Sequence, residues 1–328
     1  MSVLITGGLG YIGSHIALEL MNQGLFDVIV IDNLSNSKIE KLNKIETLNK
    51  KRKHFFFHEV ELLDYNKLVD VFSKYKIKIV IHMAGLKSVN ESIKDPILYY
   101  DNNLTSTLNL IKVMNKFSCK NLIFSSSATV YGNQEAPIHE MNLTGVNITN
   151  PYGKTKFMQE EILKDLYNSD NSWNIIILRY FNPIGHKHEL LKEDPNGIPN
   201  NLFPYILKVH NKELPILNIY GNDYDTRDGT CIRDFIHVED LSLGHVKACE
   251  YIENNENASL KIYNLGSGNG ISVLELVNAF EKVNDCKINY KFTERREGDL
   301  SESFSDCSKA NKELNWKTKK TLDELVKL

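Results

Sequence analysis

Tyr152 and Lys156 stand four residues apart, and their side-chain types suggest acid–base chemistry. Pro151 directly precedes them and predicts the start of a helix, in which positions four apart share one face at about 5–6 Å between Cβ atoms. A phenol beside an ammonium is expected to have a lowered pKa, and a tyrosine that titrates near pH 10 needs a shift of roughly 3 units to act as a base at neutral pH. The pair predicts removal of a proton from an alcohol while another group accepts a hydride. Taken alone the pattern is weak, because a lysine one turn along a helix is most often a solvated charge.

Six short apolar runs alternate with longer amphipathic segments in the first half of the chain. The runs comprise residues 3–5, 28–31, 55–57, 79–82, 122–124 and 175–178. Such runs are typical of strands buried on both faces, and the alternation predicts an α/β fold with a doubly wound parallel sheet. In such a sheet, the loops at the carboxyl ends of the strands bind the ligands.

Three glycines, Gly7, Gly10 and Gly13, follow the first predicted strand at regular spacing. They allow a tight turn, a close approach of backbone to a pyrophosphate, and close packing of the next helix on the strand. Asp32 ends the second predicted strand, where a carboxylate can accept hydrogen bonds from both adenosine-ribose hydroxyls and repels a 2′-phosphate. We therefore predict NAD rather than NADP as the cofactor. Lys38 could bind a phosphate, but it would still have to overcome the repulsion from Asp32.

From about residue 183 the sequence changes to loops and shorter elements. We therefore expect an NAD-binding Rossmann domain over residues 1–182 and a smaller, discontinuous α/β substrate domain over residues 183–328. Strands near residues 236–240 and 263–266 are expected to return to the first domain.

Composition and charge exclude several other classes of protein. The 328 residues have a formal net charge of −3, which gives no basic surface for nucleic acid. No apolar run reaches the length of about 18 residues that a membrane helix needs, and no signal peptide is expected before the first strand. Five widely spaced cysteines without a Cys-x-x-Cys pair predict neither disulfides nor a zinc site. We expect a cytoplasmic protein with reduced thiols.

The glycine motif, the serines at 125–127 and the Tyr152–Lys156 pair occur in an order that resembles the extended short-chain dehydrogenase/reductase family. The resemblance extends over the whole chain and is strongest to the members that invert C4 of a UDP-hexose. It implies interconversion of UDP-glucose and UDP-galactose, in galactose metabolism, through NAD-dependent oxidation to a 4-keto sugar. The matching segments comprise residues 7–15, 32–34, 82–87, 99–103, 124–132, 179–183, 197–202, 233–238 and 295–300.

The resemblance assigns catalytic roles to Tyr152, Lys156 and Ser127. Tyr152 would remove the proton of the sugar 4-hydroxyl, and Lys156 would hold the nicotinamide ribose and lower the pKa of Tyr152. Ser127 would hydrogen-bond the reacting oxygen or relay its proton. The residues predicted to contact tightly bound NAD are Gly7, Gly10, Tyr11, Ile12, Gly13, Asp32, Asn33, Asn36, Ser37, Glu61, Leu62, Met83, Ala84, Gly85, Lys87, Asn102, Ser125, Tyr152, Lys156 and Tyr180.

A second group of residues is implied to bind the UDP-sugar. Arg233 and Arg296 suit a diphosphate because arginine makes charge-assisted bidentate contacts, although both could instead be surface ion-pair partners. The full predicted substrate set is Lys87, Ser127, Thr129, Tyr152, Phe181, Asn182, Asn201, Leu202, Asn218, Tyr220, Arg233, Arg296, Asp299 and Ser303.

Two positions depart from the family pattern. Glu61 stands where an aspartate is usual near the adenine, and its longer side chain puts that contact in doubt. Ser303 falls at a position that lines the sugar pocket and is occupied by a large or a small side chain in different members. A small side chain leaves volume for an N-acetyl group, so we expect activity on UDP-N-acetylglucosamine and UDP-N-acetylgalactosamine as well.

Two other functions share the same fold. Nucleotide-sugar 4,6-dehydratases and uronate decarboxylases also oxidise C4, but they usually have acidic residues where this chain has Ala128 and Thr129, which cannot act as that acid/base pair. A nucleotide-sensing binding protein is the other alternative. Such proteins can lose the catalytic residues, whereas this chain retains Ser127, Tyr152 and Lys156.

Metal binding and dimer formation are less directly indicated. His186, His188 and Asp194 could suggest a metal site, but a polar loop over the substrate is the favoured interpretation, and no metal is expected. The resemblance implies a homodimer in which helices around residues 100–117 and 152–168 pack across a two-fold axis. An apolar stripe fits either that interface or burial in the core, and it consists of Leu104, Leu108, Ile111, Val113 and Met114.

Overall fold

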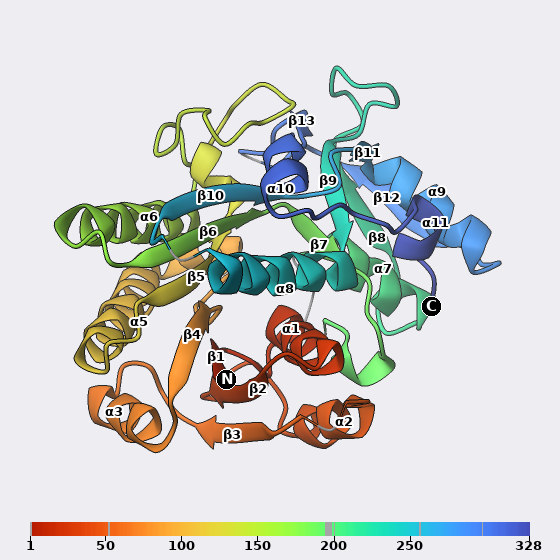
Figure 1. Cartoon of the computed structure of the whole chain (residues 1–328). Coiled ribbons are helices and arrows are strands. Elements are labelled where there is room, and N and C mark those ends of the chain that lie inside the picture. Colours follow the sequence, from red (N-terminus) through yellow and green to blue (C-terminus); the bar gives the residue numbers. More distant parts are fainter. Residues whose placement is uncertain (1, 52, 194–198, 200, 256, 297) are drawn as a thin grey trace.

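A seven-stranded parallel sheet forms the centre of the computed structural model, which describes residues 2–51, 53–193, 199, 201–255, 257–296 and 298–328. The strand order is β10-β6-β5-β4-β1-β2-β3 (Figure 1), and every neighbouring pair is parallel. This confirms the predicted doubly wound α/β fold. The strands are β1 (Ser2–Thr6), β2 (Asp27–Asp32), β3 (Phe55–Glu59), β4 (Ile77–His82), β5 (Asn121–Ser127), β6 (Asn174–Tyr180) and β10 (Leu260–Leu265).

Helices cover both faces of this sheet, and each face has its own apolar core. One core packs β1, β2 and β4 against α1 (Tyr11–Gln23), α2 (Glu40–Leu48) and α8 (Val238–Asn254). The other core lies beneath α3 (Tyr65–Lys74), α5 (Pro96–Lys116) and α6 (Pro151–Ser169), with the short α4 (Val89–Lys94) beside α5 and α6. The sheet is therefore shielded from water except at its edges and at the ends of its strands.

The remaining elements form a smaller region with a third apolar core. Strand β9 is the centre of a four-stranded sheet, and a separate pair, β8 with β12, lies beside it (Figure 1). The strands are β7 (Asn182–Ile184), β8 (Leu217–Tyr220), β9 (Ile232–His237), β11 (Gly270–Ser272), β12 (Tyr290–Thr293) and β13 (Glu302–Ser303). Its helices are α7 (Leu202–His210), α9 (Val273–Val283) and α11 (Leu322–Leu325). Helix α10 (Ser308–Glu313) packs against β10 of the large sheet, and two 3₁₀ turns, η1 (Ala128–Tyr131) and η2 (Glu189–Leu191), lie outside this core.

The six predicted strands of the first half are all present, but one is not buried on both faces. Strand β3 lies at the edge of the sheet, and Phe56 is 38% exposed. Its Phe-rich sequence resembles that of a central strand, because a strand covered on only one face can still contain consecutive aromatic residues. The sequence-based expectation of full burial is therefore wrong for β3.

The chain returns to the large sheet twice, once as predicted and once differently. Residues 263–265 lie in β10, which pairs with β6. Residues 236 and 237 instead end β9 of the smaller sheet, and Val238 begins α8, which packs against α1. The return near 236–240 is thus a helix and not a strand, because the apolar run of β9 leads directly into amphipathic spacing. The domain boundary between residues 182 and 183 stays a prediction.

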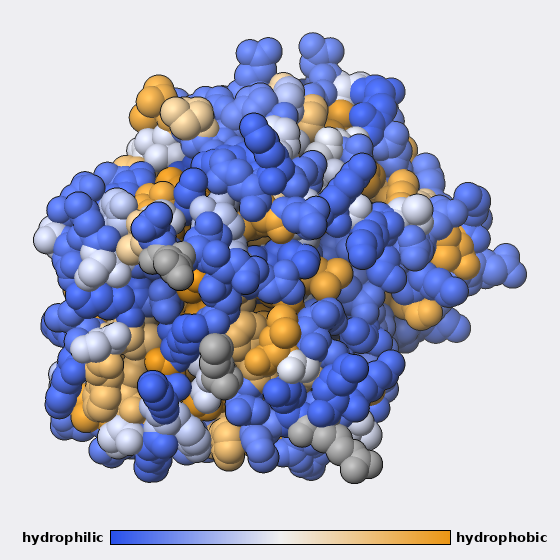
Figure 2. Space-filling model, in the orientation of Figure 1, coloured by the Kyte–Doolittle hydropathy of each residue, from blue (hydrophilic) through white to orange (hydrophobic). Residues whose placement is uncertain are grey.

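The visible surface is mostly polar (Figure 2), and the cysteines are unpaired. Figure 2 shows a largely hydrophilic face on which apolar residues form separate groups. None of the helices in the described part of the chain is both long and apolar enough to span a membrane. All five cysteines are free thiols, at positions 119, 231, 249, 286 and 307.

Candidate active site and cofactor site

The first turn of α6 places Tyr152 beside the end of β5. Pro151 occupies the first helical position, and the Asn150 side chain accepts a hydrogen bond from the Gly153 amide at 2.8 Å, which fixes the start of the helix. Ser127 ends β5, and its hydroxyl oxygen accepts hydrogen bonds from the Thr129 amide (3.2 Å) and hydroxyl (3.0 Å). With both acceptor positions used, the Ser127 proton is available for the phenol oxygen of Tyr152.

Lys156 follows one turn later and is 5% exposed. Its ammonium donates to the Ser125 carbonyl at 2.7 Å and lies 4.8 Å from the centre of the Phe124 ring. Burial lowers the pKa of Lys156 to about 8, although the negative charge of Glu160 acts in the opposite direction. The ammonium is therefore held by β5 at the same strand end as Ser127.

The pKa of Tyr152 differs from the sequence-based expectation. Burial raises the pKa of this phenol above its ordinary value, and the hydrogen bond from Ser127 lowers it by less. The Lys156 ammonium donates to the Ser125 carbonyl at 2.7 Å. The prediction counted the charges of Lys156 and of a bound cofactor cation and omitted the cost of burying a phenolate.

The glycine motif forms the predicted turn between β1 and α1. Gly7 has φ of +66°, and a Cβ on Gly13 would lie 2.3 Å from the Gly7 carbonyl oxygen. Asp32 ends β2 and accepts hydrogen bonds from the Leu9 amide (3.0 Å), the Leu34 amide (3.0 Å) and the Ser37 hydroxyl (2.8 Å). Its carboxylate is thus fixed beside the glycine turn. This geometry fits a dinucleotide, because the turn leaves no side chain in the path of a phosphate.

Glu61 is oriented by its neighbours at the end of β3. One carboxylate oxygen accepts from the Asn33 amide group at 2.6 Å and the other from the Leu63 backbone at 3.2 Å. The longer side chain therefore spans between the loops that follow β2 and β3. Its contact with an adenine stays a prediction.

The other predicted cofactor residues lie around the edge of the sheet formed by the carboxyl ends of its strands. Ile12 is in α1, Asn36 and Leu62 follow β2 and β3, Met83, Ala84 and Gly85 follow β4, Asn102 is in α5, and Ser125 and Tyr180 lie near the ends of β5 and β6. The structure thus gathers the predicted cofactor set along the carboxyl ends of the strands, where a doubly wound sheet binds its ligand.

Asn103 is a positioning residue that sequence reasoning missed. It is fully buried, its oxygen accepts from the Leu86 amide at 2.8 Å, and its nitrogen donates to the Leu86 carbonyl at 3.0 Å and to Thr155 at 3.1 Å. It therefore holds the loop before Lys87 against α6. Asn103 stands beside Asn102 in the segment 99–103 that matches the family pattern, and this position could have identified it.

Tyr180 has a buried partner that was also missed. Its hydroxyl contacts Nε2 of His245, whose Nδ1 lies 2.9 Å from the Leu241 carbonyl. Nδ1 must therefore hold the proton, so Tyr180 donates to Nε2. Burial lowers the pKa of His245 to about 4 and raises the pKa of Tyr180. His245 is on α8, more than sixty residues away in sequence, and no local pattern links the two.

On the substrate side, Asp299 contacts both arginines that are predicted to bind the diphosphate. It lies 3.5 Å from Arg233 and 2.9 Å from Arg296, and the Arg296 guanidinium lies 4.7 Å from the centre of the Tyr220 ring. Ser303 is the register partner of Arg233 between β13 and β9. Five of the predicted substrate residues are therefore close neighbours, although they come from four separate segments.

The remaining predicted substrate residues are more scattered. Phe181 is buried after β6, Asn182 is exposed at the start of β7, and Leu202 begins α7. Asn218, in β8, donates to Tyr205 at 3.4 Å, and its buried side-chain oxygen has no hydrogen-bond partner among the described residues. That oxygen is able to accept a hydrogen bond from a ligand.

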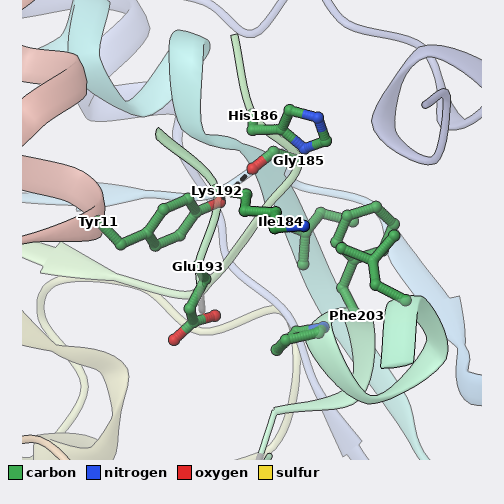
Figure 3. Close-up of a pocket in the computed structure, with 9 residues that line it drawn as sticks. Tyr11, Ile184, Gly185, His186, Lys192, Glu193 and Phe203 are labelled. Atoms are coloured by element: carbon green, nitrogen blue, oxygen red, sulfur yellow. Dashed lines mark hydrogen bonds between the residues drawn. The ribbon is translucent and has the colours of Figure 1, made fainter. Parts of the chain in front are cut away.

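Glu193 joins two predicted site residues and was not identified from the sequence. Its carboxylate accepts from Lys87 at 2.6 Å and from Asn201 at 3.0 Å. It also lines a small cavity next to Tyr11, whose hydroxyl donates to the Gly185 carbonyl at 2.6 Å (Figure 3). The segment from Gly185 to Glu193 therefore connects the glycine motif with the substrate side.

The polar loop shows no metal centre within the part of the chain that the structure describes. No group of three ligating side chains converges there. His186 and His188 lie in this loop, while Asp194 is outside the described residues.

Comparisons with known proteins assign the family. The family model described as GDP-mannose 4,6 dehydratase matches residues 4–328. A UDP-glucose 4-epimerase from Bacillus subtilis is 50% identical over 327 residues, which cover 99% of this chain and 94% of that protein.

Two solved structures are similar over nearly their whole length. The UDP-glucose 4-epimerase from Bifidobacterium longum, in complex with NAD+ and UDP, is 48% identical with a TM-score of 0.93, covering 99% of this chain and 96% of the other. The UDP-Glc/GlcNAc 4-epimerase from Campylobacter jejuni is 34% identical with a TM-score of 0.85, covering 99% and 97%. Together with the Ser127–Tyr152–Lys156 cluster, these findings show that the chain belongs to the UDP-glucose 4-epimerase family of the extended short-chain dehydrogenases/reductases.

Proposed function

We propose that this protein interconverts UDP-glucose and UDP-galactose by reversible oxidation at C4 of the sugar. The observation that carries the proposal is the hydrogen bond between Ser127 and Tyr152, with the Lys156 ammonium bound to the adjacent Ser125 carbonyl, at the strand ends where Asp32 and the glycine turn also lie. Family membership supports the substrate, because related proteins of about half-identical sequence have this activity by name. NAD is the cofactor that the glycine turn and Asp32 fit, and the Bifidobacterium longum relative binds it.

The residues of this chain act on the sugar hydroxyl and its proton. Tyr152 takes the proton of the 4-hydroxyl and later returns it, while Ser127 donates a hydrogen bond that stabilises the phenolate. Lys156, held by the Ser125 carbonyl, supplies positive charge beside them. NAD+, which the glycine turn and Asp32 would hold, would supply the acceptor for the hydride and a further positive charge.

A nucleotide-sugar 4,6-dehydratase is the nearest alternative, because the matching family model is described by that activity. The positions that would need an acid and a base are Ala128 and Thr129, and Thr129 donates its hydroxyl proton to Ser127 at 3.0 Å. Neither side chain can supply the proton transfers of an elimination. Accumulation of a 4-keto-6-deoxy sugar from UDP-glucose would show that the dehydratase is correct.

The direct test combines an assay with identification of the cofactor. Native mass spectrometry should find one NAD per chain, and a coupled assay should detect UDP-glucose formed from UDP-galactose without added cofactor. Bound NAD with no turnover of any UDP-sugar would support a nucleotide-sensing protein instead.

The proposed activity extends to the N-acetylated sugar pair. Ser303 is a small residue opposite Arg233 in the β13–β9 register, so it leaves space beside the predicted diphosphate site. The Campylobacter jejuni relative acts on both kinds of sugar by name. Ser303→Tyr should abolish conversion of UDP-N-acetylglucosamine and leave UDP-glucose conversion within about threefold, because the added ring fills only the space of the acetyl group. Wild-type protein that converts only UDP-glucose would contradict this extension.

We further propose a cytoplasmic homodimer formed through α5 and α6. The structure divides the predicted apolar stripe: Ile111, Val113 and Met114 are buried in the core, whereas Leu108 is 39% exposed. Met158 on the neighbouring α6 is 40% exposed, which adds to an apolar surface across the two helices. Leu108→Glu should yield a monomer in light scattering, and an unchanged dimer would place the interface elsewhere.

A further inference from the structure

A buried ion pair lies directly behind the proposed catalytic residues. Glu160 and Arg179 have side chains that are 0% and 2% exposed. Arg179 donates from Nε to Oε1 at 3.0 Å and from Nη2 to Oε2 at 2.7 Å, which is a bidentate contact. Ser126 donates to the same carboxylate at 2.5 Å. The pair is thus fully bonded and isolated from water.

The residues of this hydrogen-bonded group lie next to predicted site residues along the chain. Glu160 is one helical turn beyond Lys156 on the same face of α6. Ser126 lies between Ser125 and Ser127 on β5, and the Ser125 carbonyl accepts a hydrogen bond from the Lys156 ammonium. Arg179 directly precedes Tyr180 on β6. The pair therefore connects α6 to β5 and β6 at the point where each of these elements supplies a predicted site residue.

Stability alone is a weak reason for such a pair. Taking two charges out of water is costly, and apolar replacements of buried ion pairs are often neutral or stabilising. A role in the charge balance of the site accounts for its position beside Lys156.

We propose that Glu160, oriented by Arg179 and Ser126, is a positioning residue that keeps Lys156 protonated and directed at the strand end where Tyr152 works. The proposal deepens the proposed epimerase activity and rests on it. Glu160 touches neither substrate nor cofactor, so it acts through Lys156.

The other groups that face Lys156 do not replace this charge. His82 on β4 is neutral, since burial and Lys156 lower its pKa to about 3. Burial raises the pKa of the phenols of Tyr152 on α6 and Tyr180 on β6. On the far side of the pair, Arg179 lies 4.7 Å from the centre of the Tyr131 ring and donates to the Glu140 carbonyl at 3.3 Å. Within this set of groups, Glu160 supplies the negative charge that opposes the desolvation of Lys156.

The test is the pH profile of Glu160→Gln in the NAD-loaded protein. The substitution keeps the shape but leaves the Arg179 charge uncompensated, so Lys156 should lose its proton at lower pH. We expect the alkaline limb of kcat to move down by about 1 pH unit, with KM changed by less than about twofold. A purely structural role would lower the melting temperature and leave the limb in place.

Two further variants control for folding and for surface charge. Replacing both partners, with Glu160→Leu and Arg179→Met, removes the uncompensated charge and should fold, with its alkaline limb between those of Glu160→Gln and the wild type. Glu161→Gln changes the adjacent exposed residue, which pairs with Lys164, and should leave the limb unchanged.

A second readout does not depend on turnover. The rate of Lys156 acetylation by acetic anhydride, followed by peptide mass spectrometry, rises as the ammonium loses its proton. Its midpoint should also fall by about 1 pH unit in Glu160→Gln. Equal midpoints in wild type and Glu160→Gln would overturn the inference even if the epimerase proposal holds. Absence of wild-type turnover would refute the proposed function while this titration still reports on the pair.

Discussion

The cofactor side and the substrate side of this molecule hold their site residues in different ways. On the cofactor side, Asp32, Ser125 and Lys156 are each less than one-tenth exposed. The Asp32 carboxylate accepts a hydrogen bond from a backbone amide, and the Lys156 ammonium donates one to the Ser125 backbone carbonyl. On the substrate side, the Arg296 side chain is 45% exposed and its main contacts are other predicted site residues, Asp299 and Tyr220. The difference separates groups fixed by the fold from groups that can rearrange around a ligand.

This contrast suits a reaction in which the sugar must present both faces of one carbon. Fixed groups at the strand ends keep the acid–base residues in place between the two half-reactions. The exposed Arg296 can follow the nucleotide and hold it while the sugar turns. Fixed residues should therefore affect kcat and cofactor retention, and exposed residues should affect KM.

Tyr152→Phe should have the largest effect. Without the phenol hydroxyl, general acid–base catalysis is lost, and kcat should fall by about 10³-fold while bound NAD is retained. Initial rates and native mass spectrometry measure the two quantities. Tyr65→Phe, at a half-buried tyrosine on α3, is the matched control and should behave as wild type. A kcat of Tyr152→Phe within tenfold of wild type would refute the assigned role.

Asp32→Ala should release the cofactor. Loss of the predicted hydrogen bonds to the ribose should weaken NAD binding by about 100-fold and reduce the preference for NAD over NADP. Calorimetry on protein stripped of nucleotide measures both affinities. Asp27→Ala, at the other end of β2, should leave them unchanged. Tight NAD retention in Asp32→Ala would show that the glycine turn binds NAD without help from Asp32.

Arg296→Ala should act on the substrate side. Loss of one charge-assisted contact to a diphosphate should raise KM for UDP-galactose by about tenfold and change kcat by less than threefold. Arg227→Ala removes an arginine that pairs with Glu275 and is not in the predicted substrate set, and it serves as control. A large loss of kcat in Arg296→Ala would mean that the substrate side is as rigid as the cofactor side.

Glu193→Gln should give the smallest effect. Its carboxylate occupies Lys87 and Asn201, two groups predicted to serve the ligands. The Lys87 side chain is 51% exposed, and ion pairs near the surface are worth up to about 1 kcal/mol, so removing this one should tighten UDP binding by about two- to fourfold. Glu189→Gln, on the same loop, should not change the affinity. Weaker UDP binding in Glu193→Gln would indicate that the carboxylate supports the site instead of competing for it.

Local signals predicted most of the fold and the centre of the site. The glycine turn, Asp32 and the Pro151 helix start depend on neighbouring residues, so their sequence pattern was sufficient. Partners that meet only after folding left no such pattern. Glu160 with Arg179 and Tyr180 with His245 come from different elements, and neither pair could be inferred from spacing.

Burial was predicted less well than secondary structure. The exposed Phe56 of the edge strand and the divided stripe on α5 have sequences that fit burial equally well. The raised pKa of Tyr152 has the same origin, because the cost of desolvation depends on the surrounding fold and not on the adjacent lysine.

Strand β10 has a consequence for how the protein is made. Residues 260–265 complete the large sheet beside β6, so β6 lacks its last neighbour until most of the chain has left the ribosome. An unpaired strand edge is a site of mispairing during synthesis. The chain between β6 and β10 also contains much of the smaller region, so the two parts are interlaced along the gene. They cannot be separated by a single cut, and exchange of one part between relatives would require two matched junctions.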